Sequence, residues 1–354
     1  MSALRPFAAL AALALLAACQ ADGPVAVAAY GSDDLVDTPA HRLEALNTLD
    51  ARVNEVGYRL AIANTELCPH TGAVTGLLFH SASQYSDYLR PAAQARWALE
   101  GDLPGVAAVA PDSPGARAGL KVGDLVLAVD GTPLSRGTPG APAAFEGLAA
   151  NLARLDIAFA RGETLLRIRR DGVEQDVRLR PAEGCAYVYQ VDPSTELNAH
   201  ADGKRVYIAT ALAAFAETDA DLAVVLGHEM AHNVLEHRAF FDERGFARSI
   251  LGNYGNAPWE LVAAEREADR LGLYLMARAG YDPAQAPMFW RALSDRNPAL
   301  RYAQWGHPSA RSRIRAHEAV VAEIRRLQAD NLPLLPSPAS VARDDRPGRA
   351  PGGH

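Results

Sequence analysis

Five consecutive residues, His228-Glu229-Met230-Ala231-His232, have the types and spacing of a metal-dependent hydrolytic site. In an α-helix, residues four apart are rotated by about 400°, so the two imidazoles project from nearly the same side and can bind one Zn²⁺ ion. Glu229 is rotated by about 100° from His228, which places its carboxylate beside a zinc-bound water rather than on the metal. We therefore predict one zinc ion per chain, with His228 and His232 as ligands and Glu229 as the general base.

The alternative interpretation of this pentapeptide is a solvated helix face that carries two ordinary histidines. Apolar residues dominate the segment from Leu222 to Leu235, which indicates a largely buried helix. Unpartnered polar side chains are costly in such surroundings, so the metal-binding interpretation is favoured.

A catalytic zinc site needs a third protein ligand and one open position. The pattern His-Glu-x-x-His-x-x-Gly-x-x-His would supply that ligand, but Leu235 replaces its glycine and Arg238 its last histidine. His237 lies nine residues after His228, about half a turn around a continuous helix. We therefore expect His237 to be a structural or surface histidine.

Glu265, 33 residues after His232, is the remaining candidate for the third zinc ligand. Asp269 follows four residues later and shares its helix face, so we expect Asp269 to contact the second ring nitrogen of a ligand histidine. Glu267 points elsewhere on the same helix and is expected to be solvated.

The segments that carry these residues, 228–232 and 265–272, resemble peptidase family M forty-eight, the HtpX and CAAX-prenyl-endopeptidase group. Residues 198–203, 279–283 and 307–309 match the pattern of the same family. The resemblance implies a zinc metalloendopeptidase with an α+β fold of the gluzincin type, helical with a small mixed or antiparallel sheet, in which two helices carry the zinc site.

The resemblance also implies a place for the substrate. In this fold an edge strand beside the zinc helix holds an extended segment through main-chain hydrogen bonds, which favours unfolded proteins with little sequence preference. Residues 205–210 are our candidate for this edge strand. The alternative is an interior strand with no free edge.

His307 precedes Pro308, which favours an extended backbone and hence a loop before the last helix. In folds related to the resembled family, this loop passes over the zinc cleft. His307 would then either stabilise the transition-state oxyanion or occupy the open zinc position as a removable plug. The alternative is a surface histidine that caps the following helix.

The sequence from Ser113 to Gly131 closely resembles part of a bacterial PDZ domain, and the resemblance covers about residues 97–182. It implies a β-rich domain inserted into the peptidase, which binds an extended peptide as an added strand. We expect the peptide-binding loop near Leu103, Gly105 and Val106. The alternative is a PDZ domain that packs against its neighbour and binds nothing, and the sequence does not identify a ligand.

The first residues resemble a bacterial lipoprotein signal. Arg5 gives a positive start, and residues 7–18 form an apolar run that is too short to span a bilayer. The run ends in Leu-Ala-Ala-Cys19, which predicts lipidation of Cys19 and anchoring in the bacterial cell envelope, facing the periplasm. Gln20 favours the outer membrane. The alternative is a plain secretory signal with a chance cysteine.

Two further cysteines, Cys68 and Cys185, lie on either side of the PDZ segment. A chain exported to an oxidising compartment pairs such cysteines, so we predict a disulfide between them. The alternative is two unpaired buried thiols.

Composition limits the remaining possibilities. Of the 354 residues, 49% are hydrophobic and 22% charged, as in folded globular proteins. The net charge of −7, without a long basic run, argues against nucleic-acid binding. Only three cysteines are present, which excludes a disulfide-dense scaffold and a four-thiolate zinc module.

The chain is thus expected to have six parts. They are a signal peptide (1–18), a flexible stalk (19–40), an N-terminal helical part of the peptidase (41–96), the PDZ domain (97–182), the zinc peptidase core (183–330) and a disordered tail (331–354).

Together these features predict an exported, lipid-anchored zinc endopeptidase whose substrates are unfolded proteins or peptides, including misfolded envelope proteins. A rival hypothesis is a non-hydrolytic chaperone or assembly factor that uses the cleft and the PDZ domain only for binding. The presence of Glu229 argues against this rival, because binding alone needs no general base. A zinc hydrolase that acts on non-peptide bonds is a third possibility.

Overall fold

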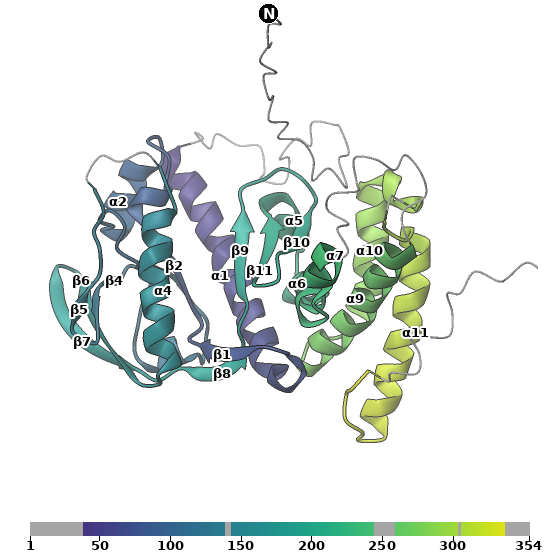
Figure 1. Cartoon of the computed structure of the whole chain (residues 1–354). Coiled ribbons are helices and arrows are strands. Elements are labelled where there is room, and N and C mark those ends of the chain that lie inside the picture. Colours follow the sequence, from purple (N-terminus) through teal and green to yellow (C-terminus); the bar gives the residue numbers. More distant parts are fainter. Residues whose placement is uncertain (1–37, 139–142, 244–258, 304–305, 337–354) are drawn as a thin grey trace, which may run out of the picture.

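The computed structural model describes residues 38–138, 143–243, 259–303 and 306–336. Helices and strands are mixed throughout this part of the chain, which confirms the α+β class (Figure 1). The predicted signal peptide, the lipidation site Cys19, nearly all of the stalk and most of the C-terminal tail lie outside the described residues. Within the described residues, no helix is both long and apolar enough to cross a membrane.

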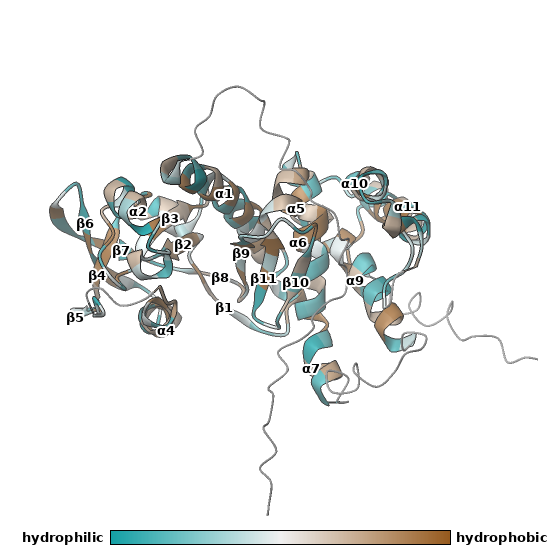
Figure 2. Ribbon diagram, turned by 90° about the horizontal axis from the view of Figure 1, so that it is seen from above, coloured by the Kyte–Doolittle hydropathy of each residue, from teal (hydrophilic) through white to brown (hydrophobic). Residues whose placement is uncertain are grey.

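The first helix, α1 (Pro39–Ala63), connects two separate hydrophobic cores. Its N-terminus is capped by Thr38, whose hydroxyl accepts a hydrogen bond from the first turn. Leu43 is buried in the core of the PDZ region, whereas Val56 and Leu60 are buried in the core of the peptidase region. Seen from above, α1 lies between the PDZ sheet and the peptidase helices (Figure 2).

The PDZ region is built on an antiparallel sheet with the strand order β2-β3-β4-β6-β7 and β5 paired to β4. Asp171 and Gly172, both with positive φ, make the tight turn between β6 and β7. Its strands are β2 (Leu77–His80), β3 (Gly105–Val109), β4 (Leu125–Val129), β5 (Thr132–Pro133), β6 (Thr164–Arg170) and β7 (Val173–Leu179), and its helices are α2 (Arg90–Trp97), α3 (Pro114–Arg117) and α4 (Glu146–Ala160).

Strand β2 corrects the predicted start of the PDZ domain at residue 97. This strand pairs with β3 and forms one edge of the PDZ sheet, although it precedes β3 by more than twenty residues that include α2. The pairing is non-local, so the short apolar run of β2 carries no local signal that it belongs to this sheet.

A two-stranded antiparallel ribbon joins the PDZ region to the peptidase region. It consists of β1 (Thr71–Val74) and β8 (Ala182–Cys185). Beside it, a disulfide connects Cys68 to Cys185, as the sequence predicted. The segment that enters the PDZ region is therefore tied, both covalently and by backbone pairing, to the segment that leaves it.

The peptidase region contains a three-stranded sheet with the order β10-β11-β9. Its strands are β9 (Val188–Asp192), β10 (Ala199–Ala201) and β11 (Arg205–Ala209); β11 pairs antiparallel with β10 and parallel with β9. The expectation that residues 205–210 form the free edge was therefore wrong, because β11 is the central strand. The hairpin of β10 and β11 is local, but the parallel pairing with β9 is set by tertiary packing.

Helices enclose this sheet and carry most of the peptidase core. Thr218 and Asp221 form a capping box at the start of α6, because each side chain accepts a backbone hydrogen bond from the other residue. The helices are α5 (Thr210–Phe215), α6 (Asp219–Val234), α7 (His237–Glu243), α9 (Trp259–Arg278), α10 (Gln285–Arg296) and α11 (Ala310–Ala329), with short 3₁₀ turns η1 (Thr65–Leu67), η2 (Ala82–Gln84) and η3 (Pro298–Arg301).

Two glycines allow α6 and α9 to cross at very short range. A Cβ atom on Gly227 would lie 3.0 Å from the carbonyl oxygen of Gly272, and one on Gly272 would lie 3.0 Å from the Cα of His228. A side chain at either position would require the facing backbone to shift by a few tenths of an ångström. The close crossing brings the face of α9 that carries Glu265 against the histidines of α6.

Candidate metal centre

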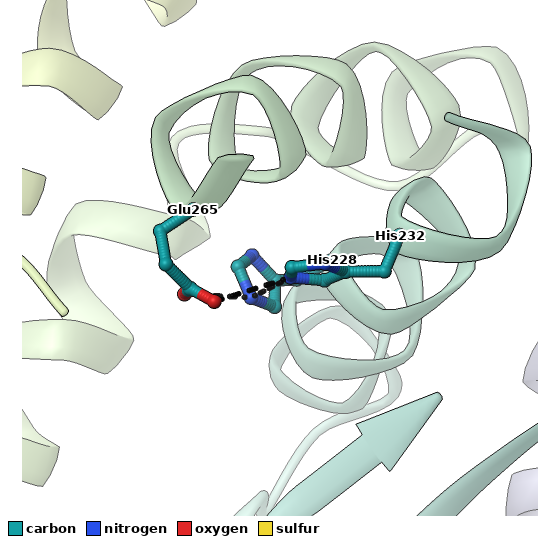
Figure 3. A group of neighbouring side chains, drawn as sticks. All are labelled: His228, His232 and Glu265. Carbon is teal, nitrogen blue, oxygen red and sulfur yellow. Dashed lines mark hydrogen bonds and ion pairs between the residues drawn. The ribbon is translucent and has the colours of Figure 1, made fainter. Parts of the chain in front are cut away.

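Three side chains from two helices point toward one another at this crossing (Figure 3). His228 and His232 come from α6, and their Nε2 atoms are 3.2 Å apart. Glu265 comes from α9, and its two carboxylate oxygens lie 3.4 Å from the Nε2 atoms of His228 and His232, respectively. The structure therefore brings together the three residues predicted as zinc ligands, with one donor atom from each within 4.8 Å of the others.

The spacing of these donor atoms fits a zinc ion. When ligands lie about 2.0–2.2 Å from Zn²⁺ in a tetrahedral site, neighbouring donor atoms are about 3.3–3.6 Å apart. The imidazole nitrogens, 3.2 Å apart, are close to this range, and each carboxylate oxygen of Glu265 lies 3.4 Å from one of these nitrogens. Two imidazole nitrogens and one carboxylate are also a donor set used by catalytic zinc sites, which keep the fourth position open.

Asp269 contacts His228, as the helix spacing predicted. Its Oδ1 lies 3.1 Å from Nδ1 of His228. The hydrogen bonds with Asp269 and Glu265 outweigh the effect of burial and raise the pKa of His228 to about 10. The carboxylates of Asp269 and Glu265 therefore stabilise the protonated form of the His228 ring.

Two buried residues of α11 contact the carboxylate of Asp269. Arg313 donates hydrogen bonds to both carboxylate oxygens, with Nε 2.9 Å from Oδ2 and 3.1 Å from Oδ1. His317 lies with its Nε2 3.4 Å from Oδ1. Burial would raise the pKa of Asp269, but the nearby charges of Arg313 and His317 hold this pKa well below its ordinary value. Asp269 is therefore a fixed carboxylate anion.

Glu229 is buried on α6 next to the first ligand histidine. Burial is the main cause that raises the pKa of Glu229 to about 7; the charge of His228 opposes this rise, and the carboxylate of Glu265 adds to it. A carboxyl group with a pKa near neutrality is well matched to accepting and returning a proton under physiological conditions.

His307 lies within contact distance of a ligand carboxylate. Its Nδ1 is 3.0 Å from Oε2 of Glu265, and its side chain is 33% exposed. Ser309 caps α11, because its hydroxyl accepts the hydrogen bond from Ser312. The alternative that His307 caps this helix was therefore wrong, and the residue stands at the rim of the metal centre.

His237 is a structural histidine, one of the two alternatives that the sequence left open, but its contacts with His232 and Glu267 were not predicted. His237 is buried rather than on the surface, with its Nδ1 3.0 Å from Nδ1 of His232. Glu267 remains partly exposed, but it is also paired, with Oε2 3.3 Å from Nε2 of His237. The prediction for His237 assumed one continuous helix, but α6 ends at Val234 and Glu236 adopts a positive φ of 54°, which redirects the chain.

The structure also corrects the expected peptide-binding loop of the PDZ region. Leu103, Gly105 and Val106 are buried. Gly105 and Val106 belong to β3, which has β2 on one side and β4 on the other, so neither edge of this strand is free to accept a peptide. The free edges of the sheet belong to β2 and β7.

Comparison with known families agrees with this geometry. Residues 173–253 match Peptidase family M48, and residues 105–151 match the PDZ domain. The chain contains a peptidase family M48 domain. The M48 match includes the helix that carries His228 and His232, and a PDZ domain precedes it in the sequence.

Three curated proteins are similar to parts of this chain. The mitochondrial metalloendopeptidase OMA1 of Schizosaccharomyces pombe is 29% identical over 154 residues, covering 36% of this chain and 45% of that protein. OMA1 of Arabidopsis thaliana is 33% identical over 126 residues, covering 31% and 26%. The beta-barrel assembly-enhancing protease of Yersinia pestis is 28% identical over 123 residues, covering 27% and 25%. The chain spans less than half the length of each of these relatives.

Among solved structures, the HtrA3 PDZ domain bound to a phage-derived ligand matches with 23% identity and a TM-score of 0.23. This match covers 32% of the present chain and 89% of the HtrA3 chain.

Proposed function

We propose that this chain is a zinc-dependent metalloendopeptidase that hydrolyses peptide bonds in extended or unfolded segments of exported proteins. The observation that carries the proposal is the convergence of His228, His232 and Glu265 at zinc-ligand spacing, with Glu229 buried beside them. The M48 match and the metalloendopeptidase relatives support the same activity.

Each residue has a distinct part in this chemistry. His228, His232 and Glu265 would hold the zinc ion, which when bound polarises a substrate carbonyl and lowers the pKa of a water molecule. Glu229 takes the proton of the attacking water and delivers it to the amine nitrogen as the peptide bond breaks. Asp269, fixed by Arg313, holds the ring of His228 in the orientation that directs Nε2 toward the metal.

Strand β10 is our candidate for the substrate-binding edge, in place of β11. It pairs with β11 on one side only, and it packs on α6, the helix that carries the two ligand histidines. An extended substrate segment would pair with this edge through main-chain hydrogen bonds. Such bonds recognise the backbone of the substrate rather than its side chains. This mode of binding supports broad specificity for unfolded proteins.

The cell envelope is our proposal for the place of action. The motif that ends in Cys19 supports a lipid anchor there, with the outer membrane favoured by Gln20. The disulfide between Cys68 and Cys185 supports an oxidising compartment. Misfolded envelope proteins are the corresponding substrates, and the PDZ domain would contribute to binding them or a partner.

The activity can be tested on an unfolded protein substrate. Purified protein should degrade unfolded casein, lose this activity when a zinc chelator is added, and regain it when zinc is restored. His228→Ala should abolish both zinc binding and cleavage, because it removes one of three ligands. Binding of casein by zinc-loaded protein without any cleavage would instead support the rival non-hydrolytic chaperone.

A further inference from the structure

The two ligand histidines have different partners at their second ring nitrogens. His228 contacts the buried carboxylate of Asp269 directly. His232 instead contacts the ring of His237, which in turn contacts Glu267. These contacts form a line of three side chains, His232, His237 and Glu267, which we call the outer histidine relay.

The local backbone explains how His237 reaches this position. The last turn of α6 ends at Val234, and Glu236 takes a left-handed conformation with φ of 54°. This turn directs the first residue of α7, His237, back toward the metal centre instead of half a turn away from it. Glu267 approaches the same ring from α9, two residues after the ligand Glu265.

One arrangement of protons satisfies every contact in the relay. Nε2 of His232 faces Glu265 and must keep its lone pair free for a metal, so the proton of this neutral ring is on Nδ1. That N–H donates to Nδ1 of His237, which therefore carries its own proton on Nε2. The N–H at Nε2 of His237 then donates to Oε2 of Glu267, because a carboxylate can only accept.

We propose that His237 and Glu267 are positioning residues that hold His232 in the tautomer and orientation needed to bind zinc. The proposal rests on the assignment of His232 as a zinc ligand in the proposed function. Outer partners of metal-bound histidines fix ring orientation in this way, and their removal typically lowers metal affinity about 10- to 100-fold.

The residues that support His228 and His232 differ in how deeply they are buried. Asp269 is buried and held by Arg313, so the support of His228 is enclosed within the protein. Glu267 is 37% exposed at its side chain, so the relay leads from the metal centre to solvent. The support of His232 can therefore be altered by substitution at a partly exposed position without opening the core.

A pair of substitutions at His237 separates positioning from packing. Asparagine can place Oδ1 where Nδ1 of His237 stands and so still accepts the hydrogen bond from His232, whereas leucine fills the space without any acceptor. We expect His237→Leu to weaken zinc binding about tenfold or more and His237→Asn to weaken it by less than about threefold. A role in packing alone would give the opposite order, because leucine is the better buried residue.

A second pair, at Glu267, keeps the test decisive if the buried His237 variants do not fold. Glu267→Gln retains an acceptor oxygen and should bind zinc nearly as the wild type does, whereas Glu267→Leu should bind several-fold more weakly. His70→Leu is the matched control, because His70 also pairs with a glutamate, Glu236, at 3.1 Å but is exposed and contacts no ligand histidine.

The measurement is the zinc dissociation constant, obtained by competition with a chelating dye, together with the melting temperature of each metal-free protein. Weaker zinc binding by the leucine variants at both positions, with unchanged melting temperatures and an unchanged control, would support the relay. Unchanged zinc affinity in Glu267→Leu and His237→Leu would overturn it. A wild-type protein that binds no zinc would instead overturn the proposed function, so the two failures are distinguishable.

Discussion

At the scale of single residues, His307 is the side chain whose contact most directly suggests control of the site. Its Nδ1 lies 3.0 Å from Oε2 of Glu265, so it engages one of the groups that would hold the metal. We expect this contact to restrain the peptidase activity until a substrate displaces the histidine.

We therefore expect His307→Ala to raise the basal rate of peptide cleavage. The expected increase is about tenfold, the factor that corresponds to about 1.4 kcal/mol. The measurement is the initial rate on a fluorogenic peptide, with zinc content determined on the same samples. A lower rate with intact zinc would identify His307 as a catalytic group, and an unchanged rate would reject both roles.

The residues of the metal centre divide into those that the sequence predicts and those that it does not. His228, His232, Glu265 and Asp269 were predictable because each pair lies four residues apart on one helix, where geometry is regular. His237 was not, because the left-handed turn at Glu236 interrupts the helix without a glycine to mark it. The contacts of Arg313 and His317 with Asp269 depend on how α11 packs, which no local pattern records.

At the scale of elements, the crossing of α6 and α9 sets the distance between the histidines and the third ligand. Gly227 and Gly272 lie at this crossing, where even a single added carbon would be only 3.0 Å from the backbone of the other helix. The two helices also make the most extensive contact between elements of the peptidase region. We therefore expect the geometry of the candidate metal centre to depend on these two glycines.

Gly272→Ala should separate α6 from α9 by a few tenths of an ångström and weaken both stability and metal binding. Overpacking of this kind typically costs about 1–3 kcal/mol in the free energy of unfolding. Denaturant unfolding and zinc competition on the same protein measure the two effects. Wild-type stability together with wild-type zinc affinity would show that the close crossing is not required.

It was easier to predict from the sequence whether a segment forms a helix or a strand than to predict which strands pair with one another. The helices that carry the metal centre follow from apolar periodicity and from the capping pattern at Thr218, and the turn at Asp171-Gly172 follows from its two residues. The neighbours of β11 and β3 did not follow, because each strand has a second partner that is not joined to it by a hairpin turn. The sequence of a short strand predicts that it pairs with another strand, but not whether it pairs along one edge or along both.

At the scale of the whole molecule, a shared helix, a β-ribbon and a disulfide join the peptidase and PDZ regions within the described residues. Helix α1 contributes buried side chains to both hydrophobic cores. The segments that enter and leave the PDZ region are held together by the ribbon of β1 and β8 and by the disulfide between Cys68 and Cys185. The order of the two regions could be read from the sequence, but the dual role of α1 could not, because one apolar stripe does not reveal that it faces two cores.

Protein isolated from the cell envelope should contain the Cys68–Cys185 linkage as a single cross-linked peptide in non-reducing mass mapping. The double substitution Cys68→Ser and Cys185→Ser should lower the free energy of unfolding by about 2–4 kcal/mol, because the bridge restricts a long loop in the unfolded chain. Thermal unfolding of both proteins measures this difference. Two alkylatable thiols in the isolated protein would contradict the predicted pairing.

The replacement of Glu229 by glutamine tests the central claim most directly. Glutamine has nearly the same size as glutamate but cannot take a proton from water, and Glu229 is not among the three groups that would hold the metal. Glu229→Gln should therefore retain about one zinc ion per chain and cleave unfolded casein about 10²- to 10⁴-fold more slowly than the wild type. Near-normal cleavage by zinc-loaded Glu229→Gln protein would contradict the assignment of Glu229 as the general base.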